Sequence, residues 1–163
     1  MIHADWFPPW GRPHDDPLTD GQDARPSQRQ DTFTVLAAPG AVLRAREGTA
    51  TRLARCGIAA GSSLSDAALL VVSELVANVL RHAADQSPTA DVTVERAVGQ
   101  LIIAVADRDP RLPAMETATP GTGLGTVREL AAWYDGVLSV EPDWAGQGKR
   151  ILASFVVPEG DVG

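Results

Sequence analysis

The sequence has few of the residues that form disulfides or bind nucleic acid. It contains one cysteine, Cys56, among 163 residues, so no internal disulfide can form. Lysine and arginine number 14 against 21 aspartate and glutamate residues, which gives a net charge of −7. Because nucleic acid is bound chiefly by neutralising phosphates with basic side chains, this charge argues against such a partner. A protein or small-molecule partner suits it better.

The sequence also lacks a stretch that resembles a membrane span or a secretory signal, and it has no internal repeat. Its first residues contain no basic stretch followed by an apolar block. With 44% hydrophobic residues, a chain of this length can bury the core of one domain. We therefore expect a cytoplasmic protein with no membrane partner.

The first thirty residues differ in composition from the rest. They are rich in Pro, Gly, Asp, Gln and Arg, and they show no apolar periodicity. The aromatic residues Trp6, Phe7 and Trp10 stand among prolines, where they form either a short docking peptide or loose contacts with the domain. We expect three segments: a disordered tail over 1–30, a folded domain over 31–158 and a C-terminal tail over 159–163.

Apolar periodicity predicts five strands and three helices in the folded segment. Strands are expected where β-branched and polar residues alternate, and helices where apolar residues recur every three or four positions. The predicted strands cover 32–39, 90–97, 99–107, 136–142 and 150–158. The predicted helices cover 39–55, 64–84 and 124–133. This β-α-α-β-β-α-β-β order fits an α+β two-layer sandwich, with helices on one face of a mixed, mostly antiparallel sheet.

Four arginines lie on the polar side of the first predicted helix. Arg44, Arg46, Arg52 and Arg55 form either a solvated face or a docking surface for an acidic partner.

Polar residues recur every fourth position in the otherwise apolar stretch SELVANVLRHA. Glu74, Asn78 and His82 fall on one helix face, where an unpaired buried polar group costs several kcal/mol, roughly 2–7. Neighbouring protein groups or a ligand must satisfy them. A carboxylate and an amide one turn apart suit phosphoryl transfer, with the amide oxygen on Mg²⁺ and the carboxylate as general base. We interpret His82 as a packing residue, and Arg81 as a solvated charge or a phosphate contact.

An aspartate and a long irregular segment follow the strand LIIAVAD. Asp107 could accept a hydrogen bond from an exocyclic amine, or it could simply start an Asx-type turn. The following residues, 108–122, have three prolines and no core periodicity. Long irregular connections inside a domain are often functional, so we expect a lid here.

Three glycines precede the third predicted helix, in the sequence PGTGLGTVRELA. Gly121, Gly123 and Gly125 would let backbone amides approach a phosphate at the positive helix end, or they would only give the loop flexibility. A Rossmann loop follows its strand immediately, whereas thirteen residues separate Asp107 from Gly121. The Walker A pattern is absent, because no Lys-Ser or Lys-Thr pair follows the glycines.

In this order and spacing, the three patterns resemble the GHKL superfamily of ATP-binding domains. Within it, the chain is similar to the small anti-sigma-factor serine/threonine kinases of Gram-positive bacteria, over about residues 32–157. SELVANVLRHA resembles the N box, VADRDPRLP the first glycine box and GTGLGTVRELAAW the second.

The resemblance implies a pocket for ATP and Mg²⁺ between the helices and the sheet. Asn78 would ligate the metal, Glu74 would be the general base and Asp107 would read the adenine amine. Arg111 or Lys149 would contact the γ-phosphate under a mobile lid. The nucleotide-binding residues implied are Asn78, Arg81, Asp107, Gly121, Thr122, Gly123, Leu124, Gly125 and Lys149.

The resemblance also implies a function and partners. The protein would phosphorylate Ser or Thr of a small STAS-like antagonist protein and sequester a sigma factor, and it would form a homodimer. Two positions depart from the family pattern, because Asp109 and Arg111 stand where the first glycine box has glycines. Side chains there would narrow or rebuild the pocket. The alternative is therefore a binding module that sequesters a partner without transferring phosphate.

Overall fold

The structure is a computed structural model that describes residues 29–143 and 146–163. The docking peptide predicted around Trp6, Phe7 and Trp10 lies outside the described residues, as does nearly all of the predicted tail.

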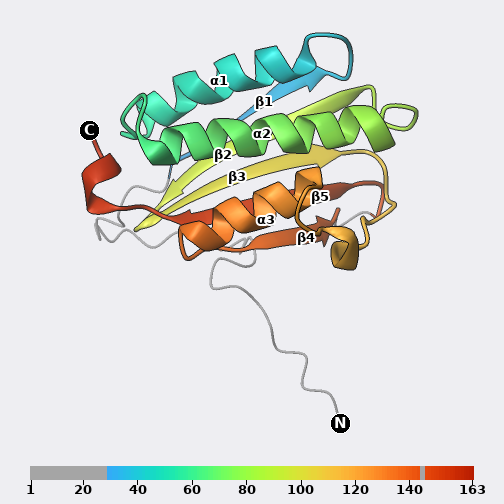
Figure 1. Ribbon diagram of the computed structural model, residues 1–163. Coiled ribbons are helices and arrows are strands. Elements are labelled where there is room, and N and C mark those ends of the chain that lie inside the picture. Colours follow the sequence, from blue (N-terminus) through green and yellow to red (C-terminus); the bar gives the residue numbers. More distant parts are fainter. Residues whose placement is uncertain (1–28, 144–145) are drawn as a thin grey trace, which may run out of the picture.

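Five strands form a single sheet in the order β1-β2-β3-β5-β4 (Figure 1). Each pair of neighbouring strands is antiparallel. The strands are β1 (Arg29–Leu36), β2 (Thr89–Ala97), β3 (Gln100–Asp107), β4 (Leu138–Pro142) and β5 (Lys149–Val156). The predicted α+β class and order of elements are confirmed.

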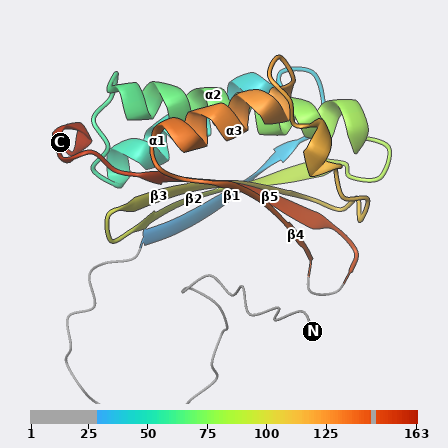
Figure 2. The ribbon, with the colours of Figure 1, turned by 60° about the horizontal axis from the view of Figure 1, so that its bottom comes forward.

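Three helices cover one face of this sheet, as Figure 2 shows. They are α1 (Ala41–Arg55), α2 (Ser63–His82) and α3 (Gly123–Trp133), and α2 lies between the other two (Figure 1). The hydrophobic core fills the space between the helices and the sheet, where the side chains of Leu75, Val79, Ile103 and Phe155 are almost completely buried. This arrangement makes α2 the central helix of the domain.

Helix α2 carries the signals that start and end a helix. The Ser62 hydroxyl accepts a hydrogen bond from the Ser65 N–H at 3.1 Å, and Arg81 and His82 occupy the last turn. By length and composition α2 would pass as a membrane span, but 56% of its apolar window is buried in the fold. A central helix of a folded domain passes the same test, so we read α2 as core.

Three of the four arginines of α1 tie that helix to its neighbours. Arg55 pairs with Asp31 at 3.5 Å. Arg52 pairs with Asp31 at 2.9 Å and lies over the Phe33 ring, 4.0 Å from its centroid. Arg46 donates to the Leu69 carbonyl at 3.1 Å. The polar side of α1 therefore holds this helix against β1 and α2. It is not purely a solvated face or purely a docking surface.

The last residues, predicted as a C-terminal tail, pack on the connection between α1 and α2. Val162 forms a β-bridge with Ile58, and the Asp161 carbonyl accepts from the Ala59 N–H at 3.1 Å. The Asp161 carboxylate accepts from the Leu64 N–H at 3.3 Å. A negative charge at this position favours the N-terminus of α2.

Candidate functional site

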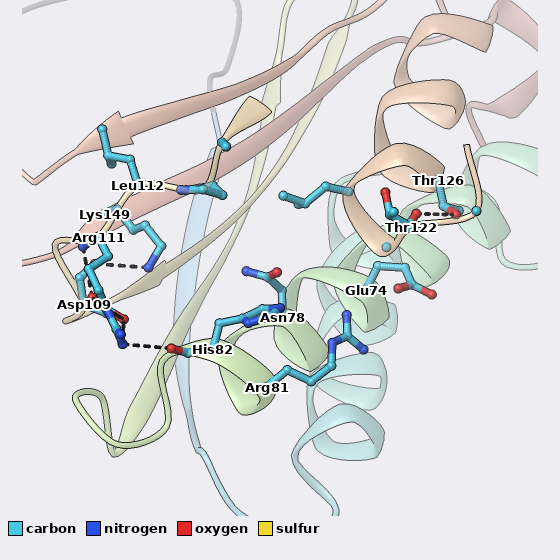
Figure 3. A pocket seen from close by; sticks show the side chains of 15 residues that line it. Glu74, Asn78, Arg81, His82, Asp109, Arg111, Leu112, Thr122, Thr126 and Lys149 are labelled. Atoms are coloured by element: carbon cyan, nitrogen blue, oxygen red, sulfur yellow. Dashed lines mark hydrogen bonds and ion pairs between the residues drawn. The ribbon is translucent and has the colours of Figure 1, made fainter. Parts of the chain in front are cut away.

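A cavity of about 800 Å³ lies between α2, the segment after β3 and the start of α3 (Figure 3). Its lining residues come from four separate parts of the sequence: α2, residues 109–114, residues 121–126 and Lys149 at the start of β5. Eight of the predicted site residues line it: Glu74, Asn78, Arg81, Gly121, Thr122, Gly123, Leu124 and Lys149. Two do not line it, Asp107 and Gly125.

Helix α2 directs Glu74 and Asn78 into the cavity from adjacent turns. Asn78 is 8% exposed, and its side-chain amide makes no hydrogen bond with the residues that the structure describes. A buried amide normally has a partner, so Asn78 is suited to a ligand that enters the cavity. Glu74 likewise has no hydrogen bond or ion pair among the described residues, and its carboxylate is therefore available as a base.

The cavity side of Gly123 faces Glu74 and Arg81 closely. A Cβ added at Gly123 would lie 2.7 Å from Glu74 Oε2 and 3.1 Å from an Arg81 guanidinium nitrogen. These contacts place a carboxylate and a guanidinium at the first turn of α3. Arg81 is exposed and lines the cavity, as a phosphate contact would require.

The N-terminus of α3 presents uncommitted backbone donors. The Thr122 hydroxyl caps the helix by accepting from the Gly125 N–H at 3.0 Å. The N–H groups of Gly123 and Leu124 have no acceptor among the described residues and lie on the cavity lining. Such a helix end attracts phosphate through its N–H groups and its dipole.

Gly125 packs against the loop that precedes α3 and does not line the cavity. A Cβ there would lie 1.8 Å from the Thr119 carbonyl oxygen, so only glycine lets the incoming loop pack against α3. Gly125 thus has a packing contact and is not on the cavity lining, and the phosphate contact predicted for it stays a prediction.

Asp107 occupies the predicted strand end but sits behind Lys149. The Lys149 ammonium donates to Asp107 Oδ1 at 2.9 Å and to the Asp109 carbonyl at 3.1 Å. Asp107 Oδ1 also accepts from the Asp109 N–H at 2.8 Å. Of these two side chains only Lys149 lines this cavity, although it is just 5% exposed.

Asp109 and Arg111, at the two glycine positions of the family pattern, pair with each other. The Arg111 Nε lies 2.9 Å from both carboxylate oxygens of Asp109, and its Nη2 donates to the His82 carbonyl at 3.0 Å. Hydrogen bonds from Arg111 lower the pKa of Asp109 to about 2. The side chains therefore rebuild this end of the cavity, and Arg111 caps α2.

His82 differs from its predicted packing role. Its side chain is exposed, lines the cavity and makes no hydrogen bond with the described residues. Its position on the same helix face as Glu74 and Asn78 was the signal for this placement.

The oxygen donors present suit Mg²⁺ bound together with phosphates. No group of three or more His, Cys, Asp or Glu side chains in 29–143 or 146–163 could hold a metal by itself. Mg²⁺ commonly takes one or two protein oxygens and completes its shell with water and substrate phosphates. The Asn78 amide fits that pattern.

Comparison with known families now identifies the domain. Residues 64–160 match the sequence model of the histidine kinase-, DNA gyrase B- and HSP90-like ATPases, which is more than half of the chain. The chain belongs to this ATPase family. The matched residues include most of α2 and all of α3 and β5, which surround the cavity.

A solved structure supports the same fold. The RsbU and RsbW domains of Rv1364c from Mycobacterium tuberculosis align with 78% of this chain at 18% identity, with a TM-score of 0.57. The chain spans 32% of that chain's length. None of the curated proteins matches the sequence significantly.

Proposed function

We propose that this ATPase-family domain is a cytoplasmic regulatory kinase. It binds ATP with Mg²⁺ in the cavity and transfers the γ-phosphoryl group to a Ser or Thr of a small protein. The observation that carries this proposal is Asn78, a residue that is 8% exposed and whose amide has no partner among the described residues and points into the cavity beside Glu74. Both groups therefore face the cavity with hydrogen-bonding capacity that a ligand can use.

The roles of the residues follow from their positions. Asn78 holds the metal, which when bound neutralises charge on the phosphates. Phosphate oxygens bind at the N-terminus of α3, to the N–H groups of Gly123 and Leu124 and to Arg81. Glu74 accepts the proton of the attacking hydroxyl, because its carboxylate is otherwise unengaged. Catalysis in such a site is mainly positioning and electrostatic stabilisation.

The partners in this proposal are a sigma factor, which the protein sequesters, and a STAS-like antagonist protein, which it phosphorylates. The sequence resemblance to anti-sigma-factor kinases supports both, and the net charge of −7 suits protein partners better than nucleic acid. The same resemblance supports a homodimer.

A second candidate is a binding module that sequesters its partner without phosphoryl transfer. The Asp109–Arg111 pair favours it, because two side chains occupy positions where the family has glycines. The two candidates differ in whether Glu74 performs chemistry.

Phosphotransfer distinguishes them. The full chain is incubated with γ-labelled ATP, Mg²⁺ and a purified candidate antagonist, alongside Glu74→Ala and a matched control, Glu129→Ala, on the exposed side of α3. A kinase labels the antagonist in wild type and Glu129→Ala but not in Glu74→Ala. Nucleotide binding without label in wild type supports the module.

A further inference from the structure

A basic side chain that does not line the cavity fastens the segment in front of α3. Arg128 lies in the second turn of α3, and its guanidinium donates to the carbonyls of Met115 and Ala118 at 2.8 and 3.2 Å. Met115 begins the short 3-10 helix η1 (Met115–Thr117), and both carbonyls belong to the connection between β3 and α3. Because a guanidinium carries its donors in a rigid planar fork, this one side chain holds two points of the connection at once.

The next carbonyl along the chain, that of Thr119, packs on the first turn of α3. It accepts from the Thr122 hydroxyl at 2.7 Å and from the Thr122 N–H at 3.1 Å. It also lies where a Cβ on Gly125 would be, 1.8 Å from that position. Two consecutive carbonyls, those of Ala118 and Thr119, are therefore held by α3 itself.

The Thr122 hydroxyl is held from both sides. It donates to the Thr119 carbonyl and accepts from the Gly125 N–H at 3.0 Å, which makes Thr122 the N-cap of α3. A hydroxyl has one donor, so the Thr119 carbonyl determines where the proton points and leaves the oxygen lone pairs for the Gly125 N–H. Thr122 lies at the cavity (Figure 3), directly before the two N–H groups that have no acceptor among the described residues. The orientation of those groups depends on this cap.

We propose that Arg128 is a positioning residue that sets the affinity of the cavity for phosphate groups. This inference rests on the proposed function, in which phosphates bind at the N-terminus of α3. Arg128 holds the Ala118 carbonyl and thereby places the Thr119 carbonyl that follows it. The Thr119 carbonyl orients the Thr122 cap, and the cap directs the first N–H groups of α3 into the cavity. Since these groups are ordered before a nucleotide arrives, less conformational entropy is lost when it binds.

A comparison of ligands with and without phosphates tests this role. The dissociation constants of ATP with Mg²⁺ and of adenosine are measured by calorimetry for the full chain and for Arg128→Met, which has no donor. The variant is expected to bind ATP about tenfold more weakly and adenosine within about twofold of wild type. A general distortion of the domain would weaken both ligands by similar factors.

A second variant tests whether Arg128 acts through the cap. Thr122→Val removes the capping hydroxyl but keeps the shape of the side chain, and it is expected to weaken ATP binding as well. If Arg128 acts through Thr122, the double variant should bind ATP within about twofold of the weaker single variant, whereas independent roles would multiply the two losses. Glu129→Ala, beside Arg128 and exposed, is the matched control and is expected to bind both ligands like wild type.

Hydrogen exchange in the ligand-free full chain, followed by NMR, examines the same contacts without a nucleotide. The Gly125 N–H donates to the Thr122 hydroxyl, so its exchange rate reports the state of the cap. In Arg128→Met this rate is expected to rise at least about tenfold, while the rate of the core residue Leu75 in α2 stays unchanged.

The outcomes separate the two proposals. Equal losses of affinity for ATP and adenosine, multiplied losses in the double variant, or an unchanged Gly125 exchange rate would overturn the role of Arg128 and leave the proposed function intact. If wild type does not bind ATP, the proposed function fails and the phosphate role of Arg128 fails with it, whatever the exchange rates.

Discussion

Replacement of Asn78 by alanine is expected to change stability and ligand binding in opposite directions. In the ligand-free protein Asn78 is 8% exposed as a residue, and its amide has no partner among the described residues. If the partner of this amide is a ligand, then removing the amide should stabilise the ligand-free protein and weaken ligand binding. A structural asparagine would weaken both.

The magnitude follows from two contributions. A buried polar group without a partner costs about 1–3 kcal/mol, and Asn78 lies at the low end because it borders an open cavity. Alanine has a higher helix propensity than asparagine by roughly 0.5 kcal/mol. The lost packing of a small side chain partly offsets both. We expect the free energy of unfolding of ligand-free Asn78→Ala to rise by about 1 kcal/mol.

Urea unfolding followed by circular dichroism measures this change, with and without ATP and Mg²⁺. A ligand present at a hundredfold excess over its dissociation constant stabilises the wild type by about 2.7 kcal/mol. In Asn78→Ala, most of the stabilisation by ATP that depends on Mg²⁺ should be lost.

A control on the same helix is Ser73→Ala. The Ser73 hydroxyl donates to the Leu69 carbonyl at 2.7 Å and accepts from Arg46, so its removal should cost about 0.5–1.5 kcal/mol and leave ligand stabilisation unchanged. If ligand-free Asn78→Ala is less stable than wild type by about the same amount, the amide is structural and the reasoning is refuted.

Three further predictions concern stability. Gly48→Ala should lower the free energy of unfolding in urea by about 1–3 kcal/mol, although alanine favours helices, because its Cβ would lie 2.5 Å from the Phe33 ring. In a Phe33→Ala background the same change should instead raise the free energy of unfolding. A single variant that is more stable than wild type would contradict the contact. Thr49→Val should raise the free energy of unfolding by about 1 kcal/mol, because the buried Thr49 hydroxyl has no partner among the described residues, and a loss of stability would reveal one. The pKa of Asp109 is about 2, below its ordinary 3.8, so the stability from its ionised form is complete above pH 4 and is lost as pH falls toward 2. The free energy of unfolding should change less steeply with pH over that window in Arg111→Met than in wild type. Equal slopes in the two proteins would argue against the Asp109–Arg111 pair.

Local periodicity was sufficient to predict the fold. The helix predicted over 64–84 is observed over 63–82, and the strand predicted over 99–107 over 100–107. These elements are long and strongly periodic, so packing does not override the local pattern. The same helical period predicted that Glu74 and Asn78 share a face, and both line the cavity. Their roles in binding and catalysis stay predictions.

Contacts between distant segments could not be predicted from the sequence. Lys149 and Asp107 are 42 positions apart, and only the β3–β5 register brings them together. The γ-phosphate contact of Lys149, which the family resemblance implied, stays a prediction. The Asp109–Arg111 pair is local, but it depends on the path of an irregular loop that has no periodicity.

The central claim is that the cavity beside α2 binds ATP through Mg²⁺ held by Asn78. Calorimetric titration of the wild type with ATP, once with Mg²⁺ and once with chelator, tests it most directly. The account predicts one site per chain, with an affinity that falls at least tenfold when Mg²⁺ is removed or when Asn78 is alanine. No binding by the wild type under either condition would contradict it.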